Sequence, residues 1–133
     1  MDYSPLVTEQ IDAGREFAAL FDAKCRPLKA AFWLKNDEES PWRLYLASDE
    51  IDDSNFDVAY GEVHRLLLHQ NDHRSFDPFQ IRVIGTEDPI AAAVLDIQQR
   101  YPGSLDTRLH NLRSGSLSVN DAYIYAFPTA VGH

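Results

Sequence analysis

The stretch from Leu28 to Ala47 constrains the fold more than any other part of this chain. Two apolar runs, each rich in aromatic and aliphatic residues, flank a polar break that ends at Pro41. Each run is short enough for a strand, and the break has the composition of a solvated turn. The stretch therefore predicts a β-hairpin. Because an isolated hairpin is only marginally stable in water, the other segments must supply further strands and helices.

Alternation of side chains along a strand sorts the hairpin residues onto two faces. We expect the more apolar face to point into the core, and it carries Ala30, Phe32, Leu34, Trp42, Leu44 and Leu46. The second face mixes aromatic and cationic side chains, and it carries Lys29, Ala31, Trp33, Lys35, Arg43, Tyr45 and Ala47. This assignment predicts that Trp33 and Tyr45 lie on the same side of the sheet.

Three segments have the apolar spacing of amphipathic helices, and they span residues 5–25, 55–71 and 89–101. The second helix follows a run of five carboxylates, in which Ser54 and Asp57 have the spacing of a capping box. Asp88 stands directly before Pro89 and is the expected N-cap of the third helix.

Further strands are predicted at 79–84, 105–112 and 117–127, with a bulge or bend at Asn120–Asp121. The chain is thus expected to form one α+β domain over residues 1–133. We expect two layers, a mixed but mostly antiparallel sheet of five or six strands with three helices packed mainly on one face. The predicted core contains Phe17, Phe21, Phe32, Leu44, Leu46, Val63, Leu67, Ile81, Val83, Val94, Ile97 and Ile124.

If the helices cover one face of the sheet, the other face displays aromatic, arginine and histidine side chains. These candidate partner- or ligand-binding residues are Trp33, Arg43, Tyr45, Arg82, Arg108, His110, Tyr123 and Tyr125. Large aromatics and arginines are enriched at the centres of protein interfaces. Two alternatives stay open: helices on both faces that would bury these residues as core, or a solvated face with only the polar tips in water.

These residues favour an interaction module without enzymatic activity that binds a protein partner or a second copy of the chain. The alternative is a small-molecule-binding protein, or a small enzyme, that uses the same face as a cleft. Single-stranded RNA binding is a third class, because aromatic sheet faces stack bases. A net charge of −9 and the lack of an RNP1 pattern disfavour nucleic-acid binding.

The sequence contains no nucleophile elbow, P-loop, GxGxxG or CxxC motif, and it indicates no cofactor and no catalytic residue. Whether the protein is an enzyme stays open, because active sites need not have a sequence motif. Asp53, Asn55 and Asp57 match the first ligand positions of an EF-hand loop. Val58 and His64 occupy the positions that require Gly and Glu, so this calcium motif is rejected.

His69 and His73 have a helical spacing that suits zinc, but a third ligand is not evident and Gln70 replaces the metalloprotease Glu. A solvated helix face is the favoured interpretation, and no metal site is predicted. Lys24 and Arg26 would lower the pKa of Cys25, but no paired base is visible, which favours a structural cysteine. A single cysteine, no signal peptide and no long apolar run indicate a cytoplasmic protein without membrane contact.

Overall fold

The computed structural model describes residues 8–37, 41–52, 54–69, 80–100, 106–114 and 117–125. The elements are α1 (Thr8–Lys24), β1 (Ala30–Lys35), β2 (Arg43–Ser48), α2 (Phe56–His69), β3 (Ile81–Gly85), α3 (Pro89–Arg100), β4 (Thr107–Ser114) and β5 (Leu117–Ile124). The strands form one sheet in the order β3-β2-β1-β5-β4. Strands β2 and β3 pair in parallel, and the other neighbouring pairs are antiparallel.

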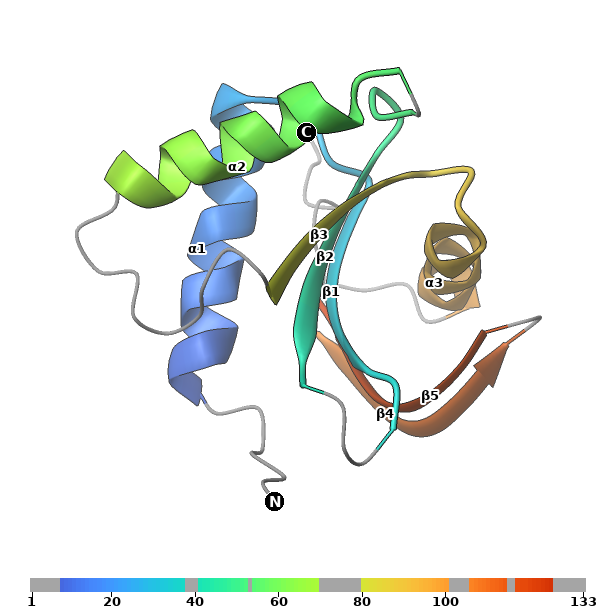
Figure 1. The fold of residues 1–133 in the computed structure, drawn as a ribbon. Helices are drawn as coiled ribbons and strands as arrows, with labels where there is room; N and C mark the ends of the chain where they lie inside the picture. The colour runs from blue at the N-terminus through green and yellow to red at the C-terminus, as the bar shows by residue number, and fades with distance from the viewer. Residues whose placement is uncertain are drawn as a thin grey trace.

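The helices cover both faces of this sheet, with α1 and α2 on one face and α3 on the opposite face (Figure 1). The α+β class, the mixed and mostly antiparallel sheet and the three helices are confirmed. The two-layer arrangement is corrected to three layers, because α3 buries its own apolar stripe against the other side of the sheet. None of the described helices is both long and apolar enough to cross a bilayer.

The cross-strand register explains why the predicted assignment of the hairpin faces was wrong. Trp33 of β1 pairs with Leu44 of β2, and Phe32 pairs with Tyr45. Trp33 and Leu44 therefore share the face under α1 and α2, whereas Phe32 and Tyr45 share the α3 face. A shift of one residue in register moves a whole set of side chains to the other face.

Two apolar cores result, one on each side of the sheet. On the first side, α1 and α2 pack Phe17, Phe21 and Val63 against the sheet. On the second side, α3 packs Val94 and Ile97 against it. Every residue of the predicted core is buried. The apolar periodicity thus identified the core residues correctly, although it did not separate them into two layers.

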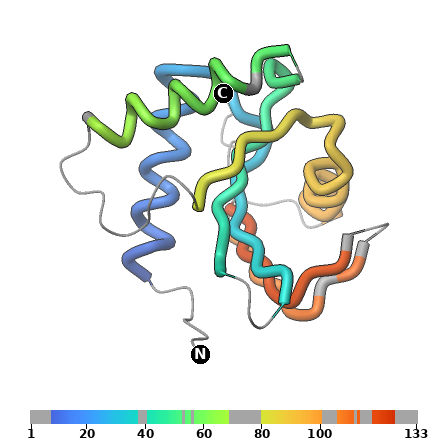
Figure 2. The backbone as a smooth tube through the Cα atoms, in the orientation of Figure 1, coloured from blue at the N-terminus to red at the C-terminus, as the bar shows by residue number. Residues whose placement is uncertain are grey.

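The hairpin of β4 and β5 curves toward α3 (Figure 2). Asn111 of β4 has a left-handed φ of 53°, a conformation that asparagine tolerates better than most residues. Leu109 and Val119 of the hairpin pack in the apolar cluster of α3. The hairpin therefore covers part of α3, and β5 continues through the predicted bend at Asn120–Asp121 as one strand.

Helix α1 approaches the sheet closely at Gly14. A Cβ atom at this position would lie 2.5 Å from the Tyr125 hydroxyl and 3.0 Å from the Trp33 indole nitrogen. The Trp33 indole N–H donates to the Tyr125 hydroxyl at 2.8 Å, and that hydroxyl donates to the Ile11 carbonyl at 2.6 Å. The close approach satisfies two buried polar side chains, and the missing side chain at Gly14 permits it.

We expect Gly14→Ala to destabilise the protein by about 1–3 kcal/mol, because its methyl group would collide with the Tyr125 hydroxyl. Urea denaturation measures this change. The matched control is Gly61→Ala in α2, where an added Cβ lies no closer than 3.8 Å to Arg65. That control should stabilise the helix by about 0.5–1 kcal/mol. Equal effects of the two substitutions would contradict the predicted close contact.

Candidate functional site

The eight predicted binding residues do not form one open face. Trp33, Arg108, His110, Tyr123 and Tyr125 share the side that α1 and α2 cover. Arg43, Tyr45 and Arg82 lie on the α3 side. Trp33 is 0% exposed, Tyr125 is 1% exposed and Tyr45 is 8% exposed. The expected open aromatic face is therefore wrong, because the protein's own helices bury its central residues.

Tyr123 and Tyr125 attach α1 to the sheet. The Tyr123 hydroxyl donates to Asp106 Oδ2 at 2.7 Å, and the same oxygen accepts a hydrogen bond from Arg15 at 2.5 Å. The Arg15 guanidinium also lies 5.2 Å from the centroid of the Tyr125 ring. Burial raises the pKa of both tyrosines, so both stay protonated. These contacts give the two tyrosines a structural role.

Arg108 and His110 lie on the edge strand β4, and both are exposed. Asp121 of β5 pairs with both, at 3.4 Å from Arg108 and 3.1 Å from His110. The Arg108 guanidinium lies 5.7 Å from the centroid of the Trp42 ring. A partner-binding role for these two residues stays a prediction, while their visible contacts link β4 to β5 and to the start of β2.

A cleft of about 610 Å³ opens at the other end of the sheet, beside the carboxyl ends of β2 and β3. The chain leaves β2 toward α2 on one face, and it leaves β3 toward α3 on the opposite face. Neighbouring parallel strands whose connections diverge in this way leave a crevice between their loops, and α/β proteins bind ligands at such points. Residues 49, 51 and 52 line one wall, and residues 84–88 line the other.

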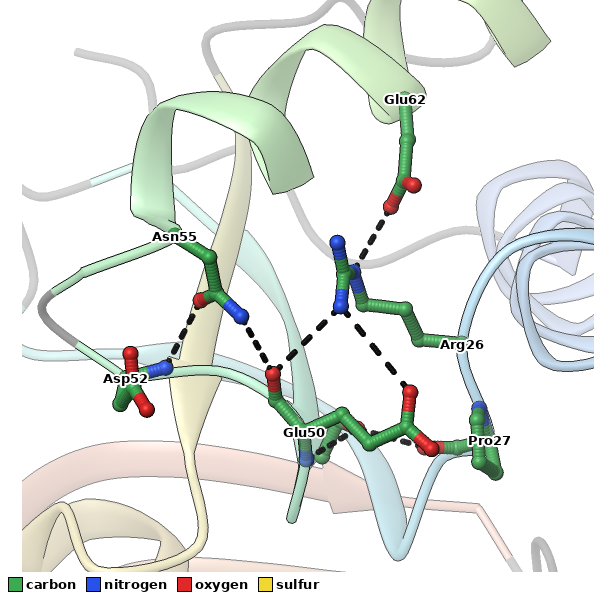
Figure 3. A network of polar contacts seen from close by, with 7 residues as sticks. Arg26, Pro27, Glu50, Asp52, Asn55 and Glu62 are labelled. Atoms are coloured by element: carbon green, nitrogen blue, oxygen red, sulfur yellow. Dashed lines mark hydrogen bonds and ion pairs between the residues drawn. The ribbon is translucent and has the colours of Figure 1, made fainter.

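A polar network fixes the wall that follows β2 (Figure 3). Arg26 Nε donates to Glu62 Oε1 at 2.9 Å, and both side chains are largely buried. Arg26 also lies 3.5 Å from the Glu50 carbonyl, which accepts a 2.6 Å hydrogen bond from the Asn55 amide. The Asn55 side-chain oxygen accepts from the Asp52 backbone N–H at 2.9 Å. These hydrogen bonds join the segment after α1 to the loop that follows β2 and to α2.

The two walls of the cleft also contact each other directly. A Cβ atom at Gly85 would collide with the Ile51 carbonyl oxygen, so glycine is needed where the two loops meet. The Thr86 hydroxyl donates to Asp49 Oδ1 at 2.6 Å. Lys29 approaches the other oxygen of Asp49 at 3.6 Å. These contacts preform the cleft, because they hold both loops without a ligand.

The cleft is acidic, and among the described residues its lining contains no basic side chain. The carboxylates in this described lining belong to Asp49, Asp52, Glu87 and Asp88. Two of them also stabilise backbone turns. Asp88 accepts from the Ile90 N–H at 2.9 Å and caps α3 as predicted. Asp52 is the second of these carboxylates, and it accepts a hydrogen bond from the Ser54 hydroxyl at 2.6 Å. Ser54 was predicted to form a capping box with Asp57, but the observed partner of its hydroxyl is Asp52.

The sequence interpretation missed this cleft because it treated the acidic run only as the start of a helix. The available signal was the position of two acidic loops, each directly after a strand. Their proximity follows only once β2 and β3 are known to be parallel neighbours.

The metal and thiol hypotheses have different outcomes. His73 and the side chain of His69 lie outside the described residues, so their zinc spacing stays untested. Within the described part of the chain, no group of three or more His, Cys, Asp or Glu side chains is arranged to hold a metal ion.

Burial raises the pKa of Cys25 and outweighs the opposing effect of Arg65, Arg26 and Lys24. This higher pKa supports the structural interpretation of Cys25.

Comparison of the chain with protein-family models, with curated proteins and with solved structures found no match.

We expect Ser54→Ala to raise the pKa of Asp52, because the Ser54 hydroxyl and backbone N–H hold that pKa below its ordinary value. A depressed carboxyl pKa stabilises the folded state above about pH 4, and that contribution is lost as the pH falls through the folded-state pKa. An NMR titration of the side-chain carboxyl carbon measures the change. Ser118→Ala on β5 is the control, and an unchanged Asp52 pKa in Ser54→Ala would contradict the assigned hydrogen bond.

Proposed function

We propose that this protein is a small-ligand-binding domain that takes an organic cation in the cleft between the loops that follow β2 and β3. The observation that carries the proposal is the position of a preformed acidic cleft where the connections of two parallel strands diverge. This is the small-molecule alternative, at a different place from the one that the sequence indicated. The protein-interaction hypothesis required an open aromatic face, and the burial of Trp33 and Tyr125 removes that support.

The size and rigidity of the cleft support a small ligand. Its volume of about 610 Å³ lies within the range of about 300–1,000 Å³ that is usual for ligand pockets. The contacts of Arg26, Asn55 and Gly85 hold its walls in place before a ligand enters. A preformed site loses less conformational entropy on binding than a site that must be ordered.

The charge of the cleft supports a cation. Glu87 is exposed, and the exposed Asp49 contacts Lys29 and Thr86 at the surface. An ammonium or guanidinium group replaces the Lys29 contact with Asp49 at little cost, because an exposed ion pair contributes at most about 1 kcal/mol. Carboxylates on both walls favour an elongated ligand with more than one positive group, such as a polyamine.

We expect spermidine to bind the full chain saturably, as measured by isothermal titration calorimetry at low ionic strength. Asp49→Asn combined with Glu87→Gln should raise the Kd by about four- to twenty-five-fold, since each exposed ion pair contributes about two- to fivefold. Binding should also weaken as salt is raised, because screening acts strongly on exposed charges.

The matched control is Asp96→Asn, which removes a carboxylate on α3 that pairs with Arg100 outside the cleft. Its Kd for spermidine should equal that of the unmodified protein. An equal loss of affinity in Asp96→Asn would show that only net charge matters and would contradict a defined site. Saturable binding of Ca²⁺ or Mn²⁺ with no binding of spermidine would also contradict the proposal.

A further inference from the structure

Three of the predicted binding residues stay together on the α3 side of the sheet. Tyr45 of β2 pairs with Arg82 of β3, and Arg43 lies two residues before Tyr45 on the same strand face. From the dimensions of parallel strands, the Cα atoms of Arg43 and Arg82 are about 8 Å apart. Helix α3 packs on β1 and β5, so Arg43 is partly exposed and Arg82 is exposed. Both guanidinium groups can reach one ligand beside Tyr45.

Neither arginine has a hydrogen-bond or ion-pair partner within the described part of the chain. This is notable in a protein with 21 Asp and Glu against 12 Lys and Arg. Arg26, Arg15, Arg100 and Arg108 each pair with a carboxylate. Arg43 is partly removed from water without such compensation, which is unfavourable for a charged group. Among the described residues, these two neighbouring positive charges therefore have no paired anion, although Asp88 acts electrostatically on Tyr45 beside them.

Tyr45 adds a hydrogen-bond donor on the same strand face as these charges. Its ring stacks on Phe32 with centroids 5.3 Å apart and an interplanar angle of 3°, which fixes its orientation. Burial raises the pKa of Tyr45, although Arg43 and Arg82 act in the opposite direction. The hydroxyl therefore carries its proton at neutral pH and is available as a hydrogen-bond donor to a ligand.

We propose that Arg43, Tyr45 and Arg82 form a binding site for the phosphate group of a small phosphate monoester. Two guanidinium groups balance the charge of a phosphate dianion, and their planar donors match its oxygen atoms. The rigid phenol supplies a third donor. The site uses different residues from the cation cleft and carries the opposite charge.

The test uses the full chain and inorganic phosphate, titrated at constant ionic strength and followed by backbone amide NMR. We expect saturable shifts centred on β2 and β3 near Tyr45. Arg43→Gln and Arg82→Gln should each raise the Kd by about tenfold or more, the range of a charge-assisted hydrogen bond. Tyr45→Phe keeps the stacked ring and removes the hydroxyl, and it should weaken binding by less.

Arg113→Gln is the matched control, because Arg113 is an exposed arginine on β4, away from this pair. Its Kd for phosphate should match that of the unmodified protein. Glycerol 3-phosphate should bind at least as tightly as inorganic phosphate, and sulfate should compete. The proposal is overturned if phosphate causes no saturable shifts, if Arg113→Gln loses as much affinity as Arg43→Gln, or if acetate binds as tightly as phosphate.

Discussion

The parallel pairing of β2 with β3 is the constraint on which the rest of the structure depends. Two consecutive parallel strands need a crossover connection, and α2 supplies it on the face that α1 also covers. The chain then leaves β3 toward the opposite face, where α3 packs. The divergence of these two connections creates the cleft, and the register of the same pair sets Arg82 beside Tyr45. Both proposed sites therefore depend on one strand pair.

The helices and the core could be predicted from the sequence because their signal is local. Apolar spacing of 3.6 residues identified Val63 and Val94, and Asp88 before a proline identified a helix start. The face of the hairpin could not be predicted in the same way. All residues of β1 are buried, so alternation carries no information about which side is the core. The pairing of Trp33 with Leu44 then depends on the register across the connecting loop.

The candidate sites show the same division between local and tertiary information. Arg43 and Tyr45 belong to one strand, so their shared face followed from period-2 alternation alone. Placing Arg82 beside these two residues also required the correct face of a second strand. That placement is correct because Arg82 of β3 pairs with Tyr45 of β2. The cleft required more, because Asp49 and Glu87 are far apart in sequence and meet only through the parallel pair. An acidic loop after a strand indicates a binding cleft only when the neighbouring strand in the sheet is known.

The opposite charges of the two proposed sites can coexist on one strand pair because of their separation. Arg82 precedes Thr86 by four residues, which corresponds to about 13 Å along β3. This distance exceeds the Debye length of about 8 Å at physiological ionic strength, which weakens the interaction of the exposed Arg82 with charges at the cleft, although Asp88 of the cleft still acts electrostatically on Tyr45. A net charge of −9 repels anions at long range and attracts cations. Anion binding therefore depends on the short-range donors of the two arginines, whereas cation binding also gains from the field of the whole protein.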